Sequence, residues 1–439
     1  MPPGFHRLIA AQFLSALADN ALLIVTIALL DERGLPAWWA PLLKFGFTLS
    51  YVLLAPFVGP LADAMPKARL MAWMNGVKVL GVLALLAHTH PVLAYTLVGI
   101  GAAAYAPAKY GLITELVPAQ RLVAANGWIE VSVVCAALLG TGLGGALVSP
   151  LLLGLPAIQA LVAALPSWPP GAPAGAGSAY TGSLLLLLGV YAAAGLLNRG
   201  VPDSGARYPA SGLHPGRLLQ VFWQSHRTLW ADRDGGLSLA VTTIFWGVGA
   251  TLQFAVLRWA AQVLHLPLDR GAWLQAAVAL GVIAGAAAAG RWVPLERARQ
   301  MLVVGVLLGA LMPVVVLCER LGLALAMLMT VGAVSGLLVV PLNALLQHRG
   351  CQLLSAGRSI AVQGASENAS VLAMLGTYAL LLWLEVPIVP LMQGFGALIA
   401  LAMLGLMWRS RRAVAAPGTG RPTAHAGSAH AGPGPRTGA

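Results

Sequence analysis

Apolar runs of about 18 residues or more recur along nearly the whole chain, and this feature constrains the fold most. A run of that length crosses a membrane as one helix, because all its backbone N–H and C=O groups can then bond within the helix. Of the 439 residues, 59% are hydrophobic and 9% are charged. A soluble protein carries about 25% charged residues. A β-barrel would show short alternating segments, which are absent here. The pattern predicts an all-α polytopic membrane protein.

The apolar runs predict twelve transmembrane helices in two halves of six. The predicted spans are 8–30, 41–62, 70–88, 92–114, 123–149, 181–199, 237–261, 272–291, 300–318, 321–346, 356–383 and 386–408. The N-terminal half is 1–199, and the C-terminal half is 237–408. The first run imitates a cleaved secretion signal around SALA, but it resumes at once as ALLIVTIALL, so we expect a span there.

Residues 151–180 interrupt the first half and are predicted to be a periplasmic insertion. The apolar piece 151–165 has only about 15 residues, which favours an interfacial or re-entrant segment over a thirteenth crossing. The Pro- and Gly-rich stretch 166–182 excludes a helix there. If 151–165 did cross, every later loop would change sides.

The basic residues indicate which side of the membrane each loop occupies, since cytoplasmic loops carry an excess of Lys and Arg. With twelve spans and the N-terminus inside, the cytoplasmic set is Arg7, Lys67, Arg69, Arg121, Arg199, Arg207, Arg217, Arg227, Arg233, Arg291, Arg297, Arg299, Arg349, Arg358 and five arginines after 408. The other side holds only Arg33, Arg270 and Arg320, with Lys44 near a span end. Both termini are therefore predicted to be cytoplasmic. The same distribution accounts for the net charge of +12 without a nucleic-acid partner.

The segment 200–236 is predicted to be a cytoplasmic linker between the halves. Its apolar residues among arginines fit an amphipathic helix on the inner membrane surface, and a plain linker fits equally well. Those apolar residues are Leu218, Leu219, Phe222, Trp223, Leu229 and Trp230. Residues 409–439 are predicted to be a disordered cytoplasmic tail, because from Ala415 they are rich in Gly, Pro, Ala and Thr.

The two halves show a weak internal repeat. Phe13 and Phe245 open spans 1 and 7, and Pro107 in span 4 matches Pro341 in span 10. GPLADAMPKARLM follows span 2, and GRWVPLERARQM follows span 8. Two parallel six-helix halves joined by a cytoplasmic loop are the plan of the major facilitator transporters.

The loop GPLADAMPKAR resembles the major facilitator signature between spans 2 and 3, with Pro66 in place of the usual second glycine. Gly59 lets two helices approach closely. Asp63 ends its helix, and the basic pair Lys67 and Arg69 follows within reach of the other half for gating contacts. The alternative is an ordinary charged loop turn.

Six ionisable residues fall inside the predicted spans: Asp19, Glu130, Glu367, Lys78, Lys109 and, near the outer end, Arg258. Such residues normally face a bundle interior or a water-filled cavity, often in pairs. Asp19 lies roughly 16 Å into its span, near the midplane. We predict that Lys78 and Glu130 are paired intramembrane charges. The alternative for all six is that they only brace helices together.

Six separated stretches resemble the bacterial lysophospholipid transporters of the inner membrane. They are AQFLSALADNALL, LAPFVGPLADA, YTLVGIGAAAYAPAKYGLITEL, ANGWIE, VPLNALLQHRG and AVQGASENASVLAMLG. The resemblance implies transport of lysophosphatidylethanolamine and lysophosphatidylglycerol from the outer to the inner leaflet, where a cytoplasmic acyltransferase restores the second chain. It implies that Asp19, Lys109 and Glu367 are important. A family arginine in span 7 corresponds to Gln253, and Arg258 could compensate only partly.

The predicted substrate-binding set is Asp19, Asn20, Lys109, Gln253, Arg258, Asn343, Glu367 and Asn368. Spans 1, 4, 7 and 10 line the central cavity in the major facilitator arrangement, which favours Asp19, Lys109, Gln253 and Asn343; Glu367 lies at a depth similar to Asp19 in span 11. Lys109 offers a point charge for a phosphate. Asp19 and Glu367 would hold an ammonium group or pair with Lys109 when the site is empty.

Two other functions compete with lipid transport. A proton-coupled major facilitator exporter of drugs or small metabolites would use Asp19 or Glu367 as a proton carrier. A membrane acyltransferase would need an H-x4-D motif, and none of the nine histidines has an Asp five residues later. We therefore predict a transporter rather than an enzyme, monomeric, with no cofactor and no metal. Cys135, Cys318 and Cys351 are interpreted as packing residues.

Overall fold

The computed structural model describes residues 1, 4–36, 38–154, 156, 159, 179–206, 208, 214–266 and 268–415. All long elements in these ranges are helices. The long helices are α1 (Phe5–Glu32), α2 (Trp39–Ala64), α3 (Lys67–Leu86), α4 (Pro91–Leu116), α5 (Leu122–Leu147), α8 (Thr181–Arg199), α9 (Pro215–Ala231), α10 (Arg233–Gln262), α11 (Leu268–Trp292), α12 (Leu302–Val315), α13 (Leu321–Leu353), α14 (Ala356–Trp383) and α15 (Ile388–Ala415). Short helices are η1 (Ala119–Arg121), α6 (Pro150–Leu153) and η2 (Leu295–Met301).

The twelve predicted spans coincide in order with all the long helices except α9. Eleven helical segments in the described ranges are long and apolar enough to cross a membrane. The remaining predicted span, α14, is not among these eleven, and its first half carries Arg358, Gln363 and Glu367. Those polar residues contact other helices of the bundle, so the predicted all-α architecture is confirmed.

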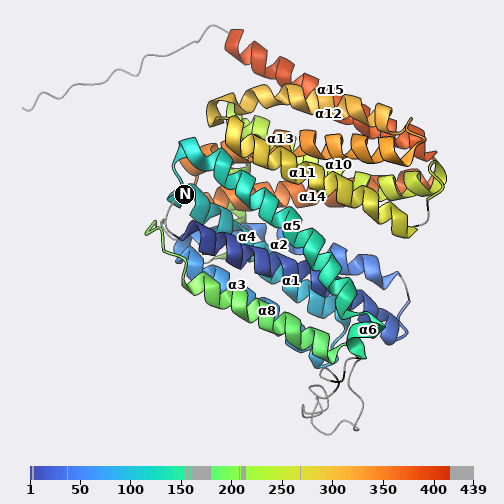
Figure 1. Ribbon diagram of the computed structural model, residues 1–439. Coiled ribbons are helices and arrows are strands. Elements are labelled where there is room, and N and C mark those ends of the chain that lie inside the picture. Colours follow the sequence, from blue (N-terminus) through green and yellow to red (C-terminus); the bar gives the residue numbers. More distant parts are fainter. Residues whose placement is uncertain are drawn as a thin grey trace, which may run out of the picture.

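Figure 1 shows the two halves side by side, one coloured blue to green and the other yellow to red. In the first half, α1 packs against α5 and α8, and α4 packs against α2 and α3. In the second half, α13 packs against α11, and α12 and α14 pack against α15 and α10 respectively. The halves meet along two seams, where α2 contacts α14 and where α5 contacts α11 and α13.

Glycines set the closest helix contact within the second half. A Cβ at Gly285 of α11 would lie 1.9 Å from the carbonyl oxygen of Ala333 on α13. A Cβ at Gly332 of α13 would lie 2.1 Å from the carbonyl oxygen of Val278 on α11. These helices can therefore touch backbone to backbone, as small residues allow in lipid, where apolar burial gives no drive for association.

Exposed tryptophans form two belts around the bundle. Trp38, Trp273 and Trp383 lie at one end of their helices. Trp73, Trp128, Trp292 and Trp408 lie near the other end. Tryptophan is enriched at both membrane–water interfaces, so the two belts mark the membrane boundaries. We call the end with the N-terminus and the α2–α3 turn the basic end.

Several predicted segments differ from the structure or lie outside it. Only the start of 151–165 is described, where α6 forms a single turn capped by Ser149. The interfacial placement of that piece, most of the insertion and the tail after 415 lie outside the described residues. Helix α15 continues to Ala415, past the predicted span end at 408. Within the linker, the structure shows helix α9 rather than a plain chain.

Candidate functional site

A buried ion pair lies inside the first half. Gln12, Ser15 and Asp19 lie on one face of α1, since they are three and four residues apart. Nζ of Lys78 on α3 lies 2.7 Å from Oδ2 of Asp19 and donates to Oγ of Ser15 at 2.9 Å. Tyr191 on α8 donates its hydroxyl to Oδ1 of Asp19 at 2.7 Å.

Asp19 therefore pairs with Lys78 rather than with Lys109. The side chain of Lys78 is 2% exposed and that of Asp19 is 16% exposed. Helix α8 packs against both α1 and α3, and the long Lys78 side chain crosses from α3 to α1 beside it. A buried acid and base cost far less together than either would alone. Sequence reasoning could not fix this pairing, because it does not show which helices are neighbours.

A second group of polar side chains extends from the first half to the interface between the halves. Lys109 on α4 donates to Oε1 of Gln12 at 3.3 Å, and its Nζ lies 4.1 Å from the ring centroid of Tyr110. Gln12 also donates to Oγ of Ser132 on α5 at 2.9 Å. The carboxylate of Glu130 on α5 attracts the Lys109 ammonium. Lys109 and Glu130 are both buried.

The second half contributes a group of hydrogen-bonded polar side chains from α10, α13 and α14. Gln363 on α14 donates to Oδ1 of Asn343 on α13 at 3.0 Å and to Oε1 of Glu367 at 2.8 Å. The hydroxyl of Thr242 on α10 also hydrogen-bonds to Glu367. Gln363 and Glu367 share one face of α14, because they are four residues apart.

Tyr110 marks the place where the two groups meet. Tyr110 is half-buried on α4, which packs against α14 of the other half, and Glu130 and Glu367 both lie near enough to act on it electrostatically. Those two carboxylates also repel each other across the interface. Tyr51 on α2 lies 3.8 Å from where a Cβ of Gly364 on α14 would be, so it too bridges the halves. We call this set the polar layer; its members are Gln12, Tyr51, Lys109, Tyr110, Glu130, Thr242, Asn343, Gln363 and Glu367.

Four predicted binding residues have no described contact with the polar layer. Asn20 and Asn368 each donate to the carbonyl four residues earlier in their own helix. The side chain of Gln253 is exposed, and its backbone carbonyl accepts a hydrogen bond from the side-chain amide of Gln275 on α11. Arg258 is half-buried, and its charge acts on Tyr378.

The signature loop closes the α2–α14 seam at the basic end. A Cβ at Gly59 would lie 3.0 Å from Cβ of Ala361, so the glycine lets the helices touch. Asp63 accepts hydrogen bonds from Oγ of Ser355 and from the amide of Gly357 at 2.8 Å. These donors belong to the N-terminus of α14, which favours an anion. Nε of Arg358 lies 3.9 Å from Oδ2 of Asp63.

The gating contact differs from the prediction in one respect. Asp63 crosses the seam, whereas the basic pair stays in the first half. Nζ of Lys67 lies 2.7 Å from Oε1 of Glu115 on α4, and both side chains are almost fully buried. Glu115 also accepts a hydrogen bond from Ser204 of the linker. Arg69 is exposed. In this structure Lys67 therefore pairs within its own half and not across the seam.

The α5–α11 seam repeats this close approach. A Cβ at Gly127 of α5 would lie 2.8 Å from the carbonyl oxygen of Ala286 and 3.3 Å from Cα of Gly290 on α11. Asn126 of α5 and Gln347 of α13 exchange two hydrogen bonds of 2.8 Å. Gly59 and Gly290 are 231 residues apart, and Gly127 and Gly357 are 230 apart, so the internal repeat places glycines at both seams.

Comparisons with known proteins agree with this architecture. The sequence profile of the Major Facilitator Superfamily matches residues 8–350. A curated relative from Shigella flexneri, named lysophospholipid transporter LplT, is 40% identical over 410 residues, which are 93% of this chain and 96% of the relative. A protein of the same name from Escherichia coli is 39% identical over the same shares.

The chain belongs to the major facilitator superfamily and, within it, to the LplT family.

Solved major facilitator structures share the fold at low identity. The human organic anion transporter MFSD10 (TETRAN) gives a TM-score of 0.68 at 15% identity and covers 92% of this chain and all of that one. The transporter FucP in its outward conformation gives a TM-score of 0.65 at 15% identity, over 92% of this chain and 98% of that one. At such identities, the likeness shows the fold alone.

In this LplT-family chain, several members of the polar layer escaped the sequence analysis. Gln12, Tyr51, Tyr110 and Gln363 carry no charge, so the cost of burying a charge, which singles out Asp19, Lys109 and Glu367, does not single them out. The spacing of Gln363 and Glu367 was an available signal, because two polar residues four apart in an apolar run share a helix face. Tyrosines give no such signal, since they occur in apolar faces as often as in polar ones.

Proposed function

We propose that this protein transports lysophospholipids across the inner membrane of a bacterium. Lysophosphatidylethanolamine and lysophosphatidylglycerol would move from the outer to the inner leaflet, where a cytoplasmic acyltransferase restores the second chain. The observation that carries the proposal is the 40% identity to LplT over nearly the whole length. In the same proposal the protein acts as a monomer, and the basic end is cytoplasmic because most loop arginines lie there.

The chemistry of the polar layer fits such a substrate. A lysophospholipid has a phosphate, a hydroxyl, often an amine, and one acyl chain. Lys109 would hold the phosphate, because among the described residues its ammonium donates its hydrogen bond to a neutral amide, Gln12, and has no ion pair within 4 Å. Glu130 and Glu367 would attract the amine from the two halves. Asp19 is already held by Lys78 and Tyr191, so its role would be to set the charge around Lys109.

The two seams suggest how access alternates. In this structure, Asp63 and the two glycine contacts close the halves together at the basic end. Inward release would require those contacts to part, while the polar layer stays between two rigid halves that rock against each other. The acyl chain would remain in lipid at a seam while the head group passes the polar layer.

Uptake of labelled lysophosphatidylethanolamine by spheroplasts tests this function, with and without a protonophore. The proposal expects uptake that depends on the protein and is lost with Lys109→Ala while the protein remains in the membrane. Gln253→Arg restores the family arginine and is expected to change head-group preference. Protein-dependent efflux of small molecules, with no lipid uptake, would instead support the proton-coupled exporter.

A further inference from the structure

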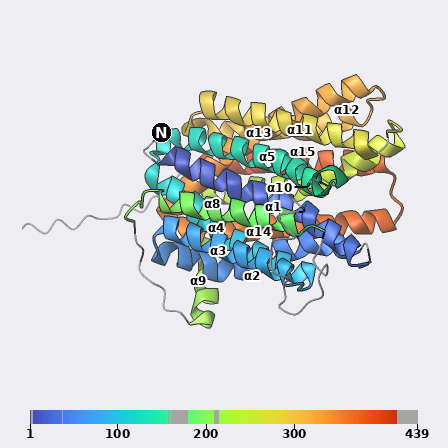
Figure 2. The same ribbon diagram turned by 60° about the horizontal axis from the view of Figure 1, so that its bottom comes forward.

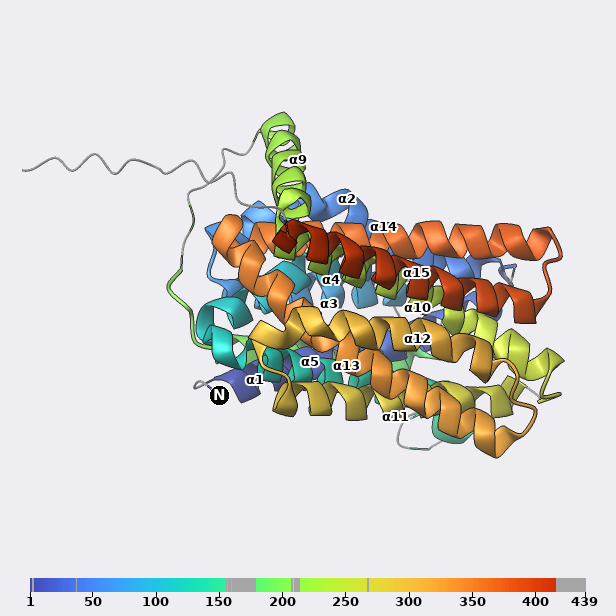
Figure 3. The same ribbon diagram turned by 90° about the horizontal axis from the view of Figure 1, so that it is seen from above.

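Helix α9 lies across the other helices near the basic end of the bundle. Figures 2 and 3 show it projecting from the side of the bundle, with its axis across the long helices. In a membrane spanned by those helices, α9 therefore runs along the surface rather than through it. The transport function is not needed for this conclusion, since the spans alone fix the membrane direction.

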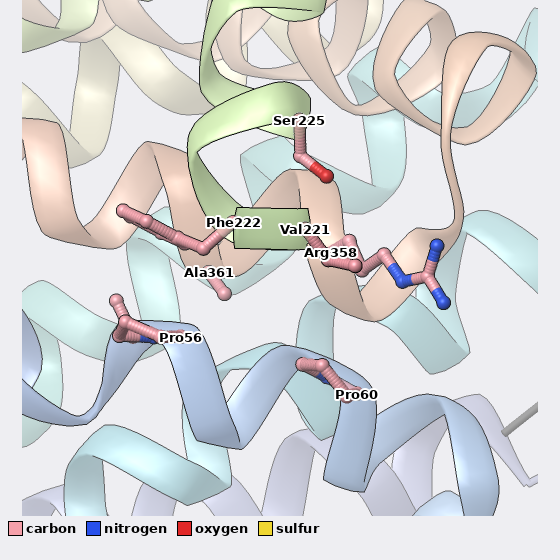
Figure 4. Close-up of a pocket in the computed structure, with 8 residues that line it drawn as sticks. Pro56, Pro60, Val221, Phe222, Ser225, Arg358 and Ala361 are labelled. Carbon is pink, nitrogen blue, oxygen red and sulfur yellow. The ribbon is translucent and has the colours of Figure 1, made fainter. Parts of the chain in front are cut away.

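One face of α9 docks on the protein. Leu218, Ser225 and Leu229 are buried, and their spacing of seven and four places them on one stripe. Leu229 packs in a cluster with residues of α10, α13 and α14. Figure 4 shows Val221 and Phe222 of α9 above Pro56 and Pro60 of α2 and Ala361 of α14. The helix thus sits over the seam between the two halves.

A second face is aromatic and partly open: Phe222, His226 and Trp230 on it are half-buried. Leu219 is 44% exposed and Trp223 is 58% exposed. The ring of His226 lies 5.5 Å from that of Trp223 and 6.0 Å from that of Trp230. With Phe222, these side chains occupy an arc of about 100° of the helix surface. Burial lowers the pKa of His226, so the imidazole adds no charge to this face at neutral pH.

A third face is polar and basic. Arg217, Gln220, Gln224, Arg227 and Thr228 are all exposed. They occupy another arc of about 100°, centred roughly 140° from the aromatic face. Within the described residues, no contact joins these two arginines to an acidic side chain. A helix with tryptophan on one side and arginine on the other is suited to the boundary between acyl chains and head groups.

We propose that α9 is a membrane-surface helix that binds the leaflet at the basic end, with Leu219 and Trp223 among the acyl chains and Arg217 and Arg227 on anionic head groups. Three observations favour lipid over a protein partner. The helix runs along the membrane plane, its open apolar face includes tryptophan as the belt at this end does, and its charges are basic. Because α9 sits over the α2–α14 seam, anionic lipid at this leaflet contacts an element that touches both halves.

Nitroxide labels on neighbouring residues test the placement. In a background with the three cysteines replaced by serine, Trp223→Cys and Gln224→Cys put labels about 100° apart on the same helix turn. Power saturation in vesicles then compares collisions with oxygen, which enters lipid, and with a water-soluble nickel complex. The proposal expects an oxygen-to-nickel ratio severalfold higher at 223 than at 224. Leu219→Cys and Gln220→Cys form a second pair, should either first variant fold poorly.

Two outcomes would overturn the placement. Equal nickel access at 223 and 224 would put the aromatic face in water. Shielding of 223 from both reagents would mean that a second copy or another protein covers it. The head-group contact has its own test, in vesicles of phosphatidylcholine with and without phosphatidylglycerol. The anionic lipid should raise the ratio at 223, and Arg217→Gln with Arg227→Gln should abolish that rise. If the anionic lipid does not raise the oxygen-to-nickel ratio at 223 in the parent protein, anionic recognition is refuted.

Discussion

Removing the cation of the Asp19–Lys78 pair should destabilise the protein more than removing both charges. Lys78→Met keeps the length of the side chain but leaves the buried Asp19 carboxylate without its cation. Breaking a buried pair from one side costs about 3–5 kcal/mol. Asp19 keeps its bond from Tyr191 and is 16% exposed, which favours the lower end, about 3 kcal/mol. At about 2.1 cal/mol/K per residue, 439 residues give roughly 1 °C per kcal/mol, so the melting temperature should fall by about 3 °C.

A double variant distinguishes the interaction energy of the pair from the separate effect of each substitution. Asp19→Asn with Lys78→Met removes both charges together, so most of the loss should be recovered, with a coupling of about 2 kcal/mol or more. Thermal unfolding at one heating rate in detergent or nanodiscs compares Asp19→Asn, Lys78→Met and the double variant with the parent. Arg69→Met is the matched control, because Arg69 is exposed and should change little. If the double variant lost the sum of the two single effects, the pair would not act as a unit and the reasoning would fail.

Three further predictions concern the basic end. Gly127→Leu should force the α5–α11 seam apart and lower uptake at least about tenfold, a loss of about 1.4 kcal/mol. Gly142→Leu is the control, because open space surrounds Gly142 and uptake should not fall. Equal uptake by the two variants would refute the close contact. Asp63→Asn should lengthen the distance between spin labels at 69 and 352, and an unchanged distribution would show that the charge does not hold the seam. Burial raises the pKa of Asp232, but hydrogen bonds from Arg349 and two backbone amides outweigh it and hold the pKa below its usual value. The stabilisation by the Asp232 carboxylate is therefore present above about pH 4 and is lost as the pH falls through the lowered pKa of the folded protein. Asp232→Asn should lower the melting temperature at pH 7 and have no effect at a pH below that pKa. A difference in melting temperature that does not depend on pH would contradict the ion pair.

The transmembrane helices could be predicted because the lipid environment leaves so few choices. Each apolar run had to be a helix, and the structure places a long helix at every predicted span. Helix α14 shows where this reasoning is weakest. Its composition leaves it outside the helices that are apolar enough to cross a membrane, although it lies in the bundle and contacts α2, α4 and α10.

The pairing of charges could not be predicted, because it depends on the lateral arrangement of the helices. Lys78 contacts Asp19, 59 residues earlier in the chain, where α1 and α3 both pack against α8. Gly59 could be assigned to a close helix contact from its motif. The role of Asp63 as an anion at the start of α14 needed the structure, since its donors lie more than 290 residues later.

Transport by the purified protein in proteoliposomes tests the role of the polar layer most directly. The measured quantity is the movement of chain-labelled lysophosphatidylethanolamine between leaflets. The account predicts transport by the parent protein, retained when Arg69 is replaced. It also predicts a fall of at least about tenfold in Lys109→Gln, since a hydrogen bond to a charged group contributes about 1.5–3 kcal/mol. Lipid movement at the parent rate in Lys109→Gln, or none in the parent protein, would contradict it.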